Sequence, residues 1–154
     1  MRGFGKICIV LGVVFIGIQF VPVDRANPPV QSDFAGPKPV KQILKQSCYD
    51  CHSNETKWPW YSYVAPVSWL VAHDVKEGRS HLNFSKWQAI RDQQDTKEEI
   101  VEEVVEGEMP MPIYLVMHTD ARLKQEAITT LKSWAGVAAG YDGHHQEGEE
   151  SYDR

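Results

Sequence analysis

Five consecutive residues, Cys48-Tyr49-Asp50-Cys51-His52, place the strongest constraint on how this chain can fold. The spacing C-x-x-C-H is the pattern by which a c-type haem is attached to protein. A zinc site would need two further ligands, and the only other cysteine, Cys8, lies in an apolar run. A redox dithiol is expected where a strand meets a helix, and no such pattern surrounds the motif. We therefore predict one covalently attached haem c on Cys48 and Cys51, with His52 as the proximal iron ligand.

The amino terminus has the pattern of an export or membrane segment. Arg2 and Lys6 precede an apolar run over residues 7–23 that only glycines, a glutamine and a proline interrupt. A charged start before such a run is typical of a signal peptide or an anchor, and no small-x-small cleavage site follows it. We predict an uncleaved membrane helix over residues 1–23, with a cleaved signal peptide as the alternative. The positive-inside rule then places the remaining chain on the periplasmic side of a bacterial inner membrane.

Composition limits the rest of the chain to one domain. Its 154 residues include 42% hydrophobic and 24% charged residues, as in an ordinary soluble domain. The net charge of -5 and the lack of a basic cluster exclude nucleic acid as a partner. We read residues 24–37 as a polar, proline-rich linker, 38–139 as the haem-binding domain and 140–154 as a disordered acidic tail. His144 and His145 of that tail are interpreted as solvated.

Helical periodicity dominates residues 38–139. Apolar residues recur three and four positions apart, and no alternating strand pattern occurs. The haem motif should follow a first helix, and Pro66 should begin a second helix that ends near Gly78. A short helix is expected from Ser85, another from a capping box at Thr96, and a final one from Leu123. The predicted fold class is all-α, a helical domain around one haem that follows an N-terminal membrane helix.

The second axial ligand of the iron is the main open question within the sequence. Methionine in this position favours electron transfer, whereas an open position favours ligand binding. Met109 and Met111 lie on a stiff loop, Met109-Pro110-Met111-Pro112, and would point the same way in an extended segment. The residues alone therefore do not choose between them. The other candidates are Met117, His73, His81 and His118.

From about Val40 to Trp134 the chain resembles the family of small bacterial haem-binding-domain proteins, monohaem relatives of cytochrome c. The motifs that carry the resemblance are the haem motif with Ser53-Asn54, Trp60-Tyr61, Ala65-Pro66-Val67-Ser68-Trp69, Gly78-Arg79, Leu82-Asn83-Phe84-Ser85, and Gly107-Glu108-Met109-Pro110 followed by Tyr114 and His118. The resemblance implies a cytochrome c-like fold. It also implies Met109 as the distal iron ligand, with Met111 as the main rival.

Analogy with cytochromes c suggests further residues around the haem. The Pro66 carbonyl is expected to accept the free N–H of His52, which would fix the ring and raise its donor strength. Buried haem carboxylates need hydrogen-bond donors. The expected donors are Arg79, Asn54, Trp60 and Trp69. For the two indoles, packing against the porphyrin is the simpler role.

These residues predict a monohaem c-type cytochrome that carries single electrons by outer-sphere transfer on the periplasmic side. Its expected partners are unidentified redox proteins, the c-type haem maturation machinery, and the membrane through the N-terminal helix. The alternative is a haem-based sensor whose distal methionine a ligand displaces. We expect no enzyme activity, because the sequence offers no distal His and Arg pair on one short helix for a small peroxidase.

Overall fold

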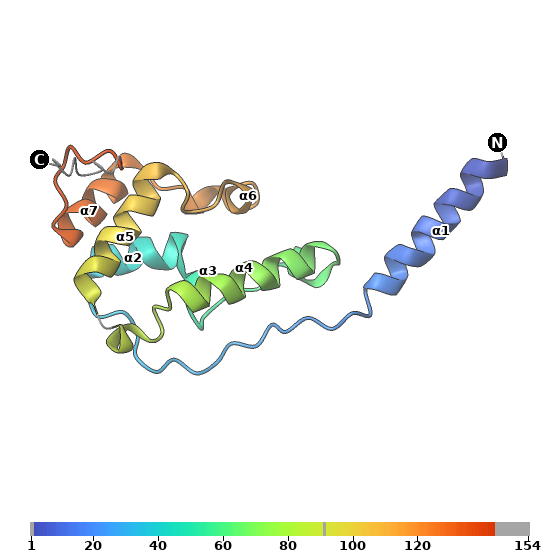
Figure 1. Cartoon of the computed structure of the whole chain (residues 1–154), viewed down its shortest axis with the longest axis horizontal. Coiled ribbons are helices and arrows are strands. Elements are labelled where there is room, and N and C mark those ends of the chain that lie inside the picture. The colour runs from blue at the N-terminus through green and yellow to red at the C-terminus, as the bar shows by residue number, and fades with distance from the viewer. Residues whose placement is uncertain (1, 91, 144–154) are drawn as a thin grey trace, which may run out of the picture. The chain divides into compact units, whose positions relative to one another are not determined.

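The computed structural model describes residues 2–90 and 92–143. Within these residues the chain forms seven α-helices and three short 3-10 helices, and its only bridge of the strand type joins Ser32 to Lys86. Contacts divide the chain into two units, Met1–Phe34 with Tyr49–Ala89 (unit 1) and Ala35–Cys48 with Ile90–Arg154 (unit 2). Figure 1 shows the helices in chain order.

The helices of each unit have the following bounds. Unit 1 contains α1 (Arg2–Ile18), α3 (Tyr49–His52) and α4 (Val67–His81), with 3-10 turns at Trp60–Tyr63 and Trp87–Ala89. Unit 2 contains α2 (Lys38–Ser47), α5 (Gln93–Glu106), α6 (Pro112–Leu115) and α7 (Gln125–Ala135), with a 3-10 turn at Thr119–Ala121.

Helix α1 corrects the prediction for the amino terminus. The helix ends at Ile18, and its uncharged part, Ile7–Ile18, reaches about 18 Å at about 1.5 Å per residue. A hydrocarbon core is about 30 Å thick. No helix within residues 2–90 and 92–143 is long and apolar enough to cross a membrane. The predicted N-terminal membrane helix is therefore wrong, because the apolar run continues through residues 19–23, where the chain is no longer helical.

An extended segment, residues 19–34, follows α1 and is fastened to unit 1 by polar contacts. The Gln19 side chain donates to the Ala65 carbonyl (3.2 Å) and accepts from the Ala65 amide (2.9 Å). The Asn27 amide group donates to the Thr56 carbonyl (2.9 Å), and the amides of Gln31 and Ser32 both donate to the Ser85 carbonyl (3.0 Å each). Most of residues 24–37, which the sequence predicted to be a linker, is thus hydrogen-bonded to the rest of unit 1.

The core of unit 1 is an aromatic cluster at the end of this segment. Tyr49 stacks on Phe84 with ring centroids 5.1 Å apart and planes 6° apart, and Phe34 meets Trp87 edge to face at 4.8 Å. All four side chains are buried. Because Tyr49 lies between the two cysteines of the haem motif, this core holds the motif residues from Tyr49 onward within unit 1.

Helix α7 forms the centre of unit 2 and packs against α5 and α2. Leu44, Val101 and Leu131 are fully buried there. Helix α5 begins four residues earlier than predicted, because Asp92 and not Thr96 is its N-cap, and the Asp92 side chain accepts the amides of Gln94 and Asp95. The Thr96 hydroxyl instead donates to the Asp92 carbonyl within the first turn (2.8 Å).

The packing of α7 predicts a large effect of truncating Leu131. We expect Leu131→Ala to lower the free energy of unfolding by about 2–5 kcal/mol, because it leaves a cavity where the side chain is 0% exposed. Chemical denaturation would measure the loss. Thr129→Ala, an exposed change on the same helix, is the matched control and should cost less than about 1 kcal/mol. Equal effects of the two changes would contradict this packing.

Candidate haem-binding site

The two cysteines of the motif lie on either side of a helix boundary. Cys48 caps α2, and its amide donates to the Leu44 carbonyl (2.8 Å). Cys51 and His52 end the short helix α3. Neither cysteine is in a disulfide, and both are of intermediate exposure. They therefore retain the chemistry needed to form thioethers with haem vinyl groups.

Tyr49 anchors the segment between the cysteines. The residue is only 3% exposed, and its hydroxyl donates to Asp33 Oδ1 (2.8 Å). Burial, and then the hydrogen bond to Asp33, raise the pKa of Tyr49 far above its usual value. The phenol therefore stays neutral, and it ties the haem motif to the extended segment 19–34.

The end of α4 and the loop after it hold the backbone of the motif. The Phe84 amide donates to the His52 carbonyl (2.8 Å), and Arg79 Nε donates to the Ser53 carbonyl (2.7 Å). The Asn54 amide donates to the buried Ser85 hydroxyl (2.9 Å). Three successive residues are thus fixed by one segment, residues 79–85.

The ring of His52 has a defined orientation within this arrangement. Its Nδ1 lies 3.3 Å from the Leu82 carbonyl oxygen, at the C-cap of α4. A carbonyl can only accept, so this contact favours the tautomer with the proton on Nδ1, which leaves the Nε2 lone pair for a metal. Burial lowers the pKa of His52, against the opposing effect of nearby backbone carbonyls, and this favours the neutral ring.

Leu82, and not the expected Pro66, supplies the carbonyl next to the His52 ring. The Pro66 carbonyl accepts the Trp69 amide instead (3.1 Å), within the first turn of α4. The analogy with cytochromes c suggested Pro66 because a proline carbonyl accepts the N–H of the proximal histidine in those proteins. No pattern in the sequence pointed to Leu82, because only the bend of the chain after α4 brings its carbonyl to the ring.

Arg79 and Asn54, two of the expected donors, are engaged by protein groups. Besides Ser53, the Arg79 guanidinium donates to the Ala26 carbonyl (2.9 Å), Asn27 Oδ1 (2.6 Å) and Thr56 Oγ1 (2.9 Å). The Asn54 side chain donates to the Pro29 carbonyl (3.0 Å) and accepts from Asn83 (2.9 Å). In this arrangement both residues join the loop after the motif to the extended segment. Their role as donors to haem carboxylates stays a prediction.

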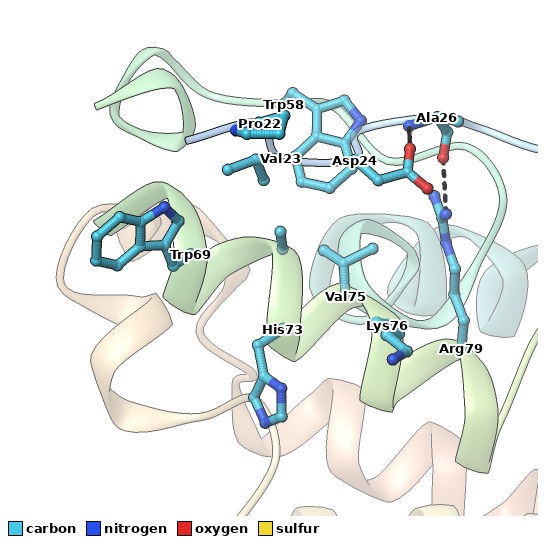
Figure 2. Close-up of a pocket in the computed structure, with 11 residues that line it drawn as sticks. Pro22, Val23, Asp24, Ala26, Trp58, Trp69, His73, Val75, Lys76 and Arg79 are labelled. Atoms are coloured by element: carbon cyan, nitrogen blue, oxygen red, sulfur yellow. Dashed lines mark hydrogen bonds between the residues drawn. The ribbon is translucent and has the colours of Figure 1, made fainter. Parts of the chain in front are cut away.

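The two expected indoles differ in their surroundings. Trp60 is 71% exposed and meets Tyr61 edge to face, whereas Trp69 is 38% exposed. Trp69 lines a cavity of about 420 Å³ between α4 and the extended segment, which Figure 2 shows with Val23 and Trp58 across from α4. Cys48, Cys51 and His52 do not line this cavity.

Trp58 is a residue that the sequence analysis did not single out. Its indole nitrogen, Nε1, is a buried donor without a hydrogen-bond partner in the described structure. Burying an unpaired donor costs free energy, so the position is one where a bound group could supply an acceptor. The sequence signal for this position is its place in the aromatic run Trp58-Pro59-Trp60.

The methionine loop belongs to unit 2. Gly107 takes the left-handed conformation (φ 80°) that ends α5, and the chain turns back so that the Met109 amide donates to the Glu103 carbonyl (3.0 Å). Met111 is the N-cap of α6. His118 stacks on Tyr114 with ring centroids 4.2 Å apart. The assignment of Met109 as the distal ligand, with Met111 as its rival, stays a prediction.

The remaining alternatives for the site are metal clusters and the other histidines. In the part of the chain that the structure describes, no group of three or more His, Cys, Asp or Glu side chains could hold a metal ion. This gives the zinc reading no support. His73 and His81 are exposed on α4, and His144 and His145 lie outside the described residues.

Two cysteine thiols in one motif with an oriented, neutral histidine form a donor set that fits haem. By this chemistry the site is that of a haem-binding protein. A family model described as a haem-binding domain matches residues 13–136, and the chain belongs to this family, with haem as its cofactor. No curated protein and no solved structure matches the chain.

The environment of Cys51 predicts slow alkylation in the haem-free protein. Burial, and then the neighbouring Asp50 carboxylate, raise the pKa of the Cys51 thiol to about 12. The thiolate is the reactive form of cysteine, and at pH 8 only about one Cys51 side chain in 10,000 is a thiolate. We expect iodoacetamide to modify exposed Cys8 at least about a hundredfold faster, as peptide mass spectrometry would measure. Urea should abolish the difference, and equal rates in the folded protein would contradict this environment.

Proposed function

We propose that this protein is a monohaem c-type cytochrome that carries single electrons between partner proteins by outer-sphere transfer. In this proposal Cys48 and Cys51 form thioethers with one haem, and His52 Nε2 binds its iron. The observation that carries the proposal is the His52 ring, whose Nδ1 is held at the Leu82 carbonyl in a motif with two cysteines outside any disulfide. When bound, haem supplies a one-electron ferric and ferrous couple.

Met109 is the proposed distal ligand, with Met111 as the rival. The glycine turn after α5 and the backbone bond to Glu103 support this choice, because they hold the Met109 backbone in place. A thioether that stays bound in both oxidation states limits the rearrangement that accompanies electron transfer. It also leaves no position at the iron for a substrate, so the proposal includes no enzyme activity.

The proposed location is the periplasmic side of the membrane, where bacteria attach c-type haem. The support is the pattern at the amino terminus, since Arg2 and Lys6 before an apolar stretch are also typical of a signal peptide. Export would bring Cys48 and Cys51 to the c-type haem maturation machinery.

The redox partners are proposed to be proteins with a basic docking surface. Helix α5 carries five glutamates over residues 93–106, in a chain of net charge -5. Burial and the neighbouring carboxylates raise the pKa of Glu103, which marks a concentrated negative charge. Such a surface steers basic partners toward unit 2, and added salt should weaken the effect.

Carbon monoxide binding tests the electron-carrier reading. We predict that the reduced, haem-loaded protein binds carbon monoxide poorly at neutral pH, because the methionine occupies the sixth position. Met109→Ala should bind it rapidly and lose the charge-transfer band of Met-ligated ferric haem, as optical spectra would show. Met111→Ala is the matched control and should behave like the unchanged protein.

Two results would change this reading. The reverse behaviour of the two variants would show that Met111, and not Met109, is the distal ligand of the iron. Rapid and complete binding of carbon monoxide to the unchanged protein would contradict stable methionine ligation and favour a haem-based sensor with a displaceable methionine.

A further inference from the structure

Helices α3 and α4 pack against each other (Figure 1). Their approach is unusually close at Gly78. A Cβ added at Gly78 would lie 2.8 Å from the Cys51 carbonyl oxygen and 3.1 Å from its carbonyl carbon. It would also lie 3.2 Å from the Cys51 Cβ. Two of these three atoms belong to the backbone, which cannot swing aside as a flexible side chain can. Any residue with a side chain would therefore push the two helices apart.

The local conformation does not require this glycine. Gly78 lies inside α4 and has a negative φ. At such a position alanine favours helix formation by about 1 kcal/mol over glycine. The reason for a glycine here is therefore the space that α3 occupies.

The same stretch of α4 leads directly to the partner of the His52 ring. The Leu82 amide donates to the Gly78 carbonyl (2.9 Å), and the Leu82 carbonyl then lies 3.3 Å from His52 Nδ1. That distance already exceeds the usual upper value of about 3.2 Å for an N–H···O bond. A shift of α3 by a few tenths of an ångström, as a Cβ would impose, would break the bond.

We propose that Gly78 is a positioning residue for the proximal haem ligand, because its missing side chain lets His52 Nδ1 reach the Leu82 carbonyl. The inference rests on the proposed function, since the ring orientation matters only if Nε2 binds iron. A hydrogen bond from Nδ1 makes Nε2 a stronger donor, and a stronger donor favours the ferric state. Gly78 thereby lowers the reduction potential of the haem.

The test compares Gly78→Ala with Ser80→Ala, an exposed change on the same helix. Both variants are produced with a c-type haem assembly system, and haem content is measured as the pyridine haemochrome. We expect both to carry covalent haem. Only Gly78→Ala should show a higher reduction potential in spectroelectrochemistry. In the Met109→Ala background, which should bind carbon monoxide rapidly, only the added Gly78→Ala change should weaken the iron–histidine vibration in the Raman spectrum after photolysis of the ferrous carbon monoxide complex.

A measurement on the unchanged protein keeps the inference testable if Gly78→Ala does not fold. In its diamagnetic ferrous form, the Nδ1 proton of His52 should give an NMR signal that exchanges slowly with water. A fast-exchanging proton would overturn the inference, and so would a destabilised Gly78→Ala with unchanged potential and vibration. Both results would leave the proposed cytochrome standing, whereas absence of covalent haem from the unchanged protein would overturn the proposed function together with the inference.

Discussion

The structure around the haem motif depends on the docking of α3 against the end of α4. A helix of four residues, Tyr49–His52, cannot be stable in isolation, because one turn does not repay the cost of nucleation. It is held by the buried Tyr49 ring, by the approach of Cys51 to Gly78, and by the bonds from residues 79–85 to the motif backbone. These contacts orient the histidine before any cofactor is bound, and such preorganisation is what a ligand on a short segment requires.

The same contacts explain why the extended segment 19–34 is ordered without a helix or a sheet of its own. Arg79 donates both to the Ser53 carbonyl after the motif and to Ala26 and Asn27 in the segment. Asp33 accepts from Tyr49 inside the motif. Hydrogen bonds to a charged donor are among the stronger ones in proteins, so this network joins the amino-terminal segment to the haem site.

The sequence predicted the parts of the site that depend on local spacing. C-x-x-C-H singles out Cys48, Cys51 and His52 as candidates because one cofactor chemistry requires that spacing, and their attachment to haem stays a prediction. Contacts between distant residues were not predictable in this way. Leu82 contacts His52 through its backbone carbonyl, and since every residue has one, the residue type does not reveal this contact. The role of Gly78 depends on how closely α3 approaches α4. The amino-terminal prediction failed because hydropathy does not show where a helix ends.

The account rests on covalent attachment of haem to Cys48 and Cys51, and intact mass spectrometry of the denatured protein tests it most directly. The protein would be matured with a c-type haem assembly system and then extracted with acidified acetone, which removes non-covalent haem. The account predicts that the extracted chain keeps the added mass of one haem and that a variant with both cysteines changed to alanine does not. An extracted chain with the mass of the bare polypeptide would contradict it.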